Sequence, residues 1–492
     1  MKKRIIIIGA GPGGLTCAMI LAHRGYDVTI FEKEDRIGGR NAAITLGNYT
    51  FDTGPTFLMM TFILREMFQE IGINIDDYCK ITPLDPLYKL SFPDKDIFPT
   101  TDHNKMQEQI EKFCGKKEKG FINFLRRERI RYDRLFPCLQ KPYDKFRTLL
   151  HPDLLRALPH LSLGRSPFDV LGDYFEDEQL RIAFTFQAKY IGMSPWECPG
   201  LFTMLPYVEH HFGVDHVEGG LSRISDAMAE VCKEKGVSIH LNTPVKKVLT
   251  HGATAKGVVL NNNEEVAADA VVINADFGYA MEHLFDPGII KKWTPEKLRN
   301  KKYSCSTFML YLGLDKLYDE PHHQIIFAND YEANINDIVN NNPPSEDMSI
   351  YIRNASITDK TIAPEGHSAL YVLVPIANMK SDTDWNEALT KEYRDKVITR
   401  MQERTSMKDL PDHIKEEKII TPTMWQNEYN LFLGSTFNLG HNLTQMLNLR
   451  PHNKFEEVDN CYIVGGGTHP GSGLPTIYES ARISANVITT NI

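Results

Sequence analysis

The first forty residues show a strand–helix–strand pattern, in which two short apolar runs flank a helical segment. Ile5–Ile8 is a continuous β-branched run, which is typical of a parallel strand covered on both faces. The pattern then predicts a helix over Gly13–Arg24, ended by Gly25, and a second strand, DVTIFE, over Asp27–Glu32. This order indicates a βαβ unit and therefore an α/β fold.

After the first βαβ unit, the sequence becomes mainly helical in character and then returns to alternating strands and helices. Residues 76–213 show helical periodicity with many aromatic side chains and several proline breaks. Strand and helix character alternates again from residue 214, with a helix predicted over Leu221–Glu234 and strands at VSIHLN, VKKVL, AKGVVL and AVVINA. Strand-like CSTFMLYLGL and ALYVLV follow after residue 301, and Cys461–Val464 is another buried strand. Such interleaving predicts two discontinuous domains.

Composition narrows the class of protein. The chain has 492 residues and a net charge of -9, so no basic excess favours nucleic acid as a partner. No stretch approaches about 18 uninterrupted apolar residues, and the apolar run after the basic N-terminus is too short for a signal peptide. The 8 cysteines are scattered without metal-ligand spacing, so we expect reduced thiols, an intracellular location and no metal site.

The loop between the first strand and helix contains the pattern G-x-G-x-x-G at Gly9, Gly11 and Gly14. The first glycine permits a tight turn, the second leaves room for a pyrophosphate, and the third lets helix and strand pack closely. Pro12 and Gly13 complete the loop, and the free N–H groups of the helix N-terminus can bind phosphate. The loop therefore predicts a dinucleotide site.

Two further segments, each at the end of a predicted strand, are expected to contribute to this site. Glu32 ends the second strand, where its carboxylate can bind both ribose hydroxyls and would repel a 2′-phosphate. Lys33 follows it directly. At the other end of the chain, a strand runs into a glycine-rich loop before a helix predicted from about Ile477. From this loop we expect ligand contacts by Gly465, Gly466, Gly467, Gly473, Leu474 and Pro475.

These motifs together resemble a known family. The glycine loop, the acid, a Gly38-Gly39-Arg40 turn, FDTGPT at residues 51–56 and THPGSGLP at residues 468–475 are similar to bacterial carotenoid desaturases of the phytoene or dehydrosqualene type. That group lies in the FAD-dependent amine-oxidase-like superfamily, and the resemblance covers nearly the whole chain. It implies a Rossmann-like FAD-binding domain over residues 1–75, 214–280 and 440–492. Residues 76–213 and 281–439 would form the substrate-binding and membrane-contacting region.

The resemblance also implies the cofactor, FAD, and further residues that contact it. We expect the turn of Gly38, Gly39 and Arg40 to approach the FAD. Additional contacts are expected from Gly54, Pro55, Thr56, Val245 beside the adenine, and Asp276 near the flavin.

In the implied reaction, a linear polyene loses a hydride to flavin N5 and a proton from the neighbouring carbon. His469 is a candidate base because it lies in the flavin loop and an unperturbed imidazole titrates near neutral pH. Arg147 and Glu428, charged residues in aromatic or apolar segments, are further candidates. A channel for the substrate could be lined by Phe184, Phe186, Tyr190, Met193, Phe202, Met204, Tyr207 and Phe212, although such residues also form ordinary cores.

Several alternatives stay open. A carotenoid isomerase or a terminal-methyl oxygenase would share these motifs, and a Rab GDP-dissociation-inhibitor-like carrier or an amine oxidase would share the fold. Lys189, His210, His211 and Asp215 are more polar than expected beside a hydrocarbon and would suit an oxygenated substrate. A lipid-dissolved substrate implies a cytoplasmic protein bound peripherally to membranes, and residues 154–161 could dip into the interface. The electron acceptor (oxygen or quinone), C30 or C40 substrate and oligomeric state are not determined.

Overall fold

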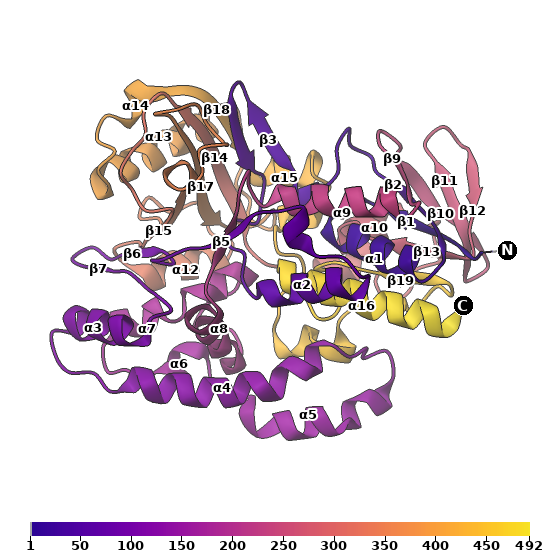
Figure 1. Cartoon of the computed structure of the whole chain (residues 1–492), viewed down its shortest axis with the longest axis horizontal. Helices are drawn as coiled ribbons and strands as arrows, with labels where there is room; N and C mark the ends of the chain where they lie inside the picture. Colours follow the sequence, from indigo (N-terminus) through magenta and orange to yellow (C-terminus); the bar gives the residue numbers. More distant parts are fainter. Residues whose placement is uncertain (1) are drawn as a thin grey trace.

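The computed structural model describes residues 2–492, apart from the side chains of residues 189–191. Lys189 and Tyr190, named above, therefore lie outside the described side chains. Figure 1 shows three parts: a sheet that carries both chain termini, a second sheet with α13 (Glu387–Arg404) against it, and a group of helices beneath them.

The first part is a five-stranded parallel sheet assembled from distant stretches of the chain. Its order is β19 (Cys461–Ile463), β13 (Ala270–Ile273), β1 (Arg4–Ile8), β2 (Asp27–Phe31) and β9 (Ser238–His240). Side chains of β1 alternate between two cores: Ile5 and Ile7 face one, and Ile6 and Ile8 face the other. Both faces of this strand are buried, which is why its sequence is apolar throughout.

Helices and a small sheet cover the two faces. One face packs against α1 (Pro12–His23), α2 (Thr61–Glu70), α9 (Ser222–Glu234) and α16 (Leu474–Asn491). The other packs against α10 (Phe277–His283) and the antiparallel sheet β10 (Val245–His251), β11 (Thr254–Leu260), β12 (Glu265–Ala267). Both α1 and α16 have proline in the first turn, where the ring removes an N–H that has no partner within the helix. The glycine loops therefore lead directly into helix N-termini.

The second part is a seven-stranded mixed sheet. Its order is β18 (Ile414–Ile420), β14 (Ser306–Leu314), β17 (Ser368–Ile376), β16 (Ile350–Asn354), β15 (His323–Ile326), β6 (Lys89–Ser91) and β7 (Asp96–Ile97). Alternate residues of β14 face opposite sides: Phe308 and Leu310 pack with α13, whereas Met309 faces away from it. This second face is the one that borders the site described below.

The third part is helical and has its own aromatic core. Its helices are α3 (His103–Cys114), α4 (Gly120–Leu139), α5 (Pro152–Ala157), α6 (Pro167–Leu171), α7 (Glu178–Ala183) and α8 (Met204–Phe212). The remaining elements are β3 (Ala43–Leu46), β4 (Tyr49–Asp52), β5 (Ile81–Pro83), β8 (Asp215–Val217), α11 (Pro295–Arg299), α12 (Tyr331–Val339), α14 (Leu410–His413) and α15 (Pro422–Asn427).

The α/β fold and the N-terminal strand–helix–strand unit predicted from the sequence are confirmed, with bounds within one residue. The C-terminal helix was predicted to start at Ile477, but it begins at Leu474, because Pro475 occupies its first turn instead of preceding it. Within residues 2–492, no helix combines the length and apolarity that a membrane crossing requires. The two-domain boundaries remain a prediction.

Candidate functional site

A cavity of about 560 Å³ runs between the parallel sheet and the seven-stranded sheet. All but two of the residues expected to bind the cofactor line it. These are Gly9, Gly11, Pro12, Gly13, Glu32, Lys33, Gly39, Arg40, Gly54, Pro55, Thr56, Val245, Asp276, Gly465, Gly466, Gly467, Gly473, Leu474 and Pro475. The exceptions, Gly14 and Gly38, lie directly behind the lining. The chain thus brings together segments more than 450 residues apart around one space.

The N-terminal loop has room for backbone only. Gly9 has a φ of +97°, which a residue with a side chain rarely adopts, and its N–H donates to Phe31 O at 2.8 Å. A Cβ atom on Gly13 would lie 2.7 Å from Asn274 Oδ1, and one on Gly14 only 2.3 Å from Gly9 O. Gly14 therefore serves the close packing of helix and strand, while Gly13 keeps the cavity wall open.

Gly38 acts on the same loop from outside the cavity. Its N–H donates to Ala10 O at 2.8 Å, and its φ of +100° makes the turn that brings the next residue close to Gly11. A Cβ atom on Gly39 would lie 3.6 Å from Gly11 Cα. The two glycine segments therefore form one continuous wall, with Arg40 at its end.

Glu32 is oriented for a diol. Its buried carboxylate accepts hydrogen bonds from Ala10 N at 2.7 Å and Glu34 N at 3.0 Å, one on each oxygen. Each oxygen retains a lone pair that can accept from a ribose hydroxyl. Pro244 and Val245 line the cavity beside it, so an apolar surface for a base lies next to the acid. These features fit the adenosine half of a dinucleotide.

Arg40 supplies a half-buried positive charge next to the glycine loop. Its Nη1 donates to Thr436 O at 2.6 Å. Asn438, with its amide oriented to satisfy both neighbours, accepts from Arg40 Nη2 at 3.3 Å and donates to Asp276 Oδ2 at 2.6 Å. Burial lowers the pKa of Arg40 and raises that of Asp276, and their mutual attraction opposes both shifts. A guanidinium held here suits a pyrophosphate.

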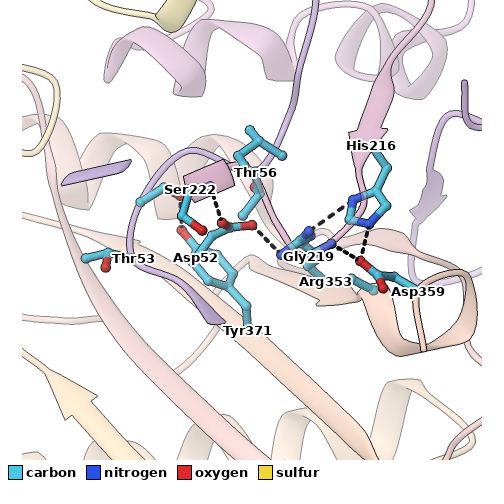
Figure 2. Close-up of polar contacts among 12 residues, drawn as sticks. Asp52, Thr53, Thr56, His216, Gly219, Ser222, Arg353, Asp359 and Tyr371 are labelled. Atoms are coloured by element: carbon cyan, nitrogen blue, oxygen red, sulfur yellow. Dashed lines mark hydrogen bonds and ion pairs between the residues drawn. The ribbon is translucent and has the colours of Figure 1, made fainter. Parts of the chain in front are cut away.

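The FDTGPT segment is anchored by a buried charge network (Figure 2). Arg353 Nη1 donates to Asp52 Oδ2 at 2.7 Å, and both side chains are almost fully buried. His216 Nδ1 lies 3.2 Å from Arg353 Nη2, and its Nε2 donates to Asp359 Oδ2 at 2.8 Å. Burial disfavours the charge on Asp359, but hydrogen bonds from His216, Thr361 and backbone N–H groups outweigh it, so the pKa is lowered well below its usual range.

Tyrosines of the seven-stranded sheet hold the same segment from the cavity side. Tyr371 OH donates to Gly54 O at 2.8 Å, and Thr56 Oγ1 is hydrogen-bonded to Tyr351 OH, also at 2.8 Å. The path from Asp52 to Thr56 is therefore fixed from both sides, by the buried network and by the sheet.

Beyond Thr56 the cavity becomes apolar. Its wall here comes from the β-sheet, the segment after the FDTGPT motif, and α15 with the loop that follows it. The apolar lining comprises Phe57, Met59, Phe186, Met309, Ile325, Ile350, Leu373, Pro375, Trp425, Leu431 and Phe437. One end of the cavity thus carries charged and backbone polar groups, and the other suits a hydrocarbon.

Most aromatic residues proposed for a channel are not part of this wall. Of that set, only Phe186 lines the cavity among the described side chains. Phe184 and Tyr207 pack in the aromatic core of the helical part, and Phe212 is partly exposed. His210 is likewise buried against Phe184, so its polarity says nothing about the substrate. The helical periodicity of these aromatic residues reflects their packing in the core of the helical part, whereas the cavity wall comes mainly from strands.

The three candidate bases are not brought together at the cavity. His469 is buried against Tyr143, outside the lining, and burial together with Arg450 lowers its pKa to about 3. Arg147 is exposed on the short helix η3 (Phe146–Leu150). Glu428 does line the cavity, but its backbone carbonyl is beside Lys33, whose Nζ donates to it. A base must reach the proton it removes, so this geometry assigns none of the three that role.

Sequence reasoning missed several lining residues. Asn274 sits between the two glycine loops and donates to Gly9 O at 3.2 Å. It directly follows β13, and a polar side chain directly after a buried strand was a usable signal. Thr436, Asn438 and Tyr351 carry no such signal, because nothing local to them indicates a ligand.

The chain is similar to known proteins over nearly its whole length. The family model for flavin-containing amine oxidoreductases matches residues 12–489. A 4,4′-diapophytoene desaturase (4,4′-diapolycopene-forming) from Methylomonas sp is 51% identical over 99% of this chain and 95% of the relative. A zeta-carotene-forming phytoene desaturase from Myxococcus xanthus is 37% identical over 99% of this chain and 94% of the relative.

A solved structure of an oxidoreductase from Methanosarcina mazei superposes with a TM-score of 0.63 at 16% identity, covering 99% of this chain and 100% of that one. This likeness concerns the fold alone. The family match over nearly the whole sequence, together with the glycine loops that line the cavity, leads to one conclusion: the chain belongs to the flavin-containing amine oxidoreductase family.

Proposed function

We propose that this protein is an FAD-dependent desaturase of a linear carotenoid precursor, with the C30 compound 4,4′-diapophytoene as first candidate and C40 phytoene as second. The observation that carries the proposal is one cavity that joins the glycine loops and charged residues expected to bind the cofactor to an apolar wall. The 51% identity to a diapophytoene desaturase supports the choice of substrate.

The choice of FAD follows from the residues that form the polar end. Glu32 is poised for a ribose, Val245 for an adenine, and Arg40 for a pyrophosphate. FMN would leave the first two without a partner. FAD held by these residues would supply hydride acceptance. Loss of a hydride and of a proton from neighbouring carbons of the substrate would then convert one C–C bond to C=C. Oxygen or a quinone would take up the two electrons released in each such step.

The protein's own residues position the reactants. The segment from Gly54 to Thr56 is held by Tyr371 and Tyr351 at the border between the polar and apolar halves. A polyene in the apolar half would meet the flavin at this border, with water excluded by the surrounding aliphatic and aromatic side chains.

We also propose peripheral membrane contact through an apolar patch on the helical part. The patch comprises Phe146, Leu150, Leu155, Leu158 and Leu163, of which Phe146 is 75% exposed and Leu150 64% exposed. Exposed Lys145, Arg147 and Arg156 lie among these residues and suit anionic headgroups. Within the stretch 154–161, Leu154 and Ala157 are buried, so the segment is anchored on one side and presents leucines on the other.

Expression of the chain in one bacterium that accumulates 4,4′-diapophytoene and another that accumulates phytoene tests the function. Pigments that lose two hydrogens per step and absorb at longer wavelength are expected in the first host. The variant Gly11→Val is the matched control, because its side chain would collide with Asn274 in the nucleotide loop. Unchanged precursor in both hosts, from a protein that carries flavin, would contradict the proposal. An added oxygen or an isomer of equal mass would instead identify an oxygenase or an isomerase.

A further inference from the structure

Arg450 is a buried cation that the proposed reaction has not used. It is 1% exposed and lies in the loop before the C-terminal glycine motif. All five of its N–H groups are directed at backbone carbonyls. They donate to Thr468 O at 3.0 Å, Gly440 O at 3.2 Å, Gln445 O at 3.3 Å, Leu439 O at 3.2 Å and Gly466 O at 2.7 Å. No carboxylate of a described residue lies within 4 Å of it.

The charge on Arg450 is therefore satisfied by hydrogen bonds but not neutralised. Burial lowers its pKa to about 10, so the side chain stays positive at neutral pH. Taking a cation out of water is costly unless an anion accompanies it. Arg40, by comparison, has Asp276 as a nearby carboxylate. An uncompensated charge beside a ligand cavity is a common feature of sites where negative charge develops.

The hydrogen bonds of Arg450 also set the direction of a peptide that lines the cavity. The C=O and N–H of a trans peptide point in opposite directions. Because Gly466 O faces Arg450, the N–H of Gly467 points the other way, and Gly467 lines the cavity. In the described chain this N–H donates to no protein acceptor. The next helix, α16, directs its free N-terminal N–H groups to the same region.

We propose that Arg450 is a positioning residue that polarises the C-terminal glycine loop toward negative charge on the flavin. It does so by turning the Gly467 N–H into the cavity and by adding a full positive charge behind it. The inference rests on the proposed function, since it requires flavin in this cavity. It assigns the arginine a role in electron acceptance that a purely structural brace of the loop would not have.

The test uses flavin-bearing protein and sulfite, an anion that adds to flavin N5 and bleaches its absorbance. Sulfite affinity reports positive charge near the flavin and requires no carotenoid substrate. We expect tight binding by the wild-type protein, a loss of about tenfold or more in Arg450→Gln, and a much smaller loss in Arg450→Lys, which keeps the charge. The flavin midpoint potential is expected to fall in the same order.

Arg404→Gln is the matched control. Arg404 also donates to backbone carbonyls, those of Phe327, Ser91 and Phe92, but lies outside the cavity lining. It should leave sulfite affinity unchanged. Wild-type affinity in flavin-bearing Arg450→Gln would overturn the inference while leaving the proposed function intact. If Arg450→Gln does not retain flavin, Arg450→Lys decides: sulfite affinity no better than that of free flavin would overturn the inference. A wild-type protein without any flavin would refute the proposed function itself.

Discussion

At the scale of single residues, Glu209 is the clearest case of a group that the fold holds in an unusual charge state. Its carboxyl is completely buried, accepts from Tyr88 OH at 2.7 Å and Gln187 Nε2 at 2.6 Å, and has no cation beside it. Burial raises its pKa to about 7, although the two hydrogen bonds oppose the shift. The folded protein therefore keeps the proton over a range in which the unfolded chain releases it.

The consequence is a pH-dependent stability. Between about pH 4.5 and 7 the folded state binds more protons than the unfolded state, so the free energy of unfolding falls as pH rises, by roughly 3–4 kcal/mol in all. We expect Glu209→Gln to remove this slope. Its new amide N–H can also pair with Gln187 Oε1, which has no partner in the described structure. Urea unfolding at pH 5.5 and pH 8 measures the difference.

The matched control for this prediction is Glu218→Gln, whose side chain is exposed and should leave the pH slope as it is. The assigned charge state would be contradicted if the free energy of unfolding of the wild type were higher at pH 8 than at pH 5.5 and Glu209→Gln showed the same pH dependence.

The buried pair of Asp52 and Arg353 leads to a second prediction. Each is almost fully buried, and removing one partner leaves the other charge without compensation. Asp52→Ala should lower the free energy of unfolding by about 3–5 kcal/mol. Flavin retention should fall as well, because Asp52 directly precedes the segment that lines the cavity. Urea unfolding and the ratio of flavin to protein absorbance measure the two effects, and an unchanged urea midpoint would refute the prediction.

At the scale of elements, the start of α1 depends on one close approach. A Cβ atom on Gly14 would lie 2.3 Å from Gly9 O, so Gly14→Ala must push helix and strand apart. We expect the protein to lose flavin binding even where it remains folded, since the same loop forms the cavity wall. Gly236→Asn is the control: open space surrounds this glycine of an exposed turn, and asparagine tolerates its positive φ. Full flavin content in Gly14→Ala would argue against the assigned packing.

The helix α5 and its neighbours carry the membrane prediction. Phe146→Ser with Leu150→Ser removes the two most exposed apolar side chains of the patch. We expect co-sedimentation with vesicles containing anionic lipid to drop severalfold, while flavin content stays constant. Leu241→Ser with Leu317→Ser is the control, as these leucines are partly exposed elsewhere. Equal vesicle binding by both double variants and the wild type would assign the contact to another surface.

Some elements could be predicted from the sequence and others could not. The first βαβ unit was predicted within one residue, because Ile5–Ile8, the glycine loop and Glu32 signal their structure through neighbours in the chain. The apolar half of the cavity was not predicted. Its wall comes from strands such as β14 and β17, which are buried on both faces, and their sequences do not indicate which face borders a ligand. The helical aromatics were assigned to that wall on periodicity, which a packed core explains equally well.

At the scale of the whole molecule, the site depends on contacts between very distant segments. Arg353 meets Asp52 across 301 positions, and Asn274 meets Gly9 across 265. No local pattern encodes such pairs. The charge network in Figure 2 links β4, β8 and β16 behind the border of the cavity, and so couples the nucleotide-binding part to the second sheet. Cofactor binding should therefore stabilise more than the glycine loops alone.

That coupling gives the last prediction, on cofactor removal. A ligand that binds only the folded state stabilises it by about 3 kcal/mol at a hundred times its Kd. Flavin-free protein should melt several degrees lower than the flavin-bearing form, and added FAD should restore the melting temperature. FMN lacks the adenosine that Glu32 and Val245 are placed to bind, so at equal concentration it should restore little. The variant Glu32→Ala separates the two causes: its response to FAD should shrink toward that of FMN. Equal stabilisation of the wild type by FMN and FAD would mean that the polar end of the cavity does not bind adenosine.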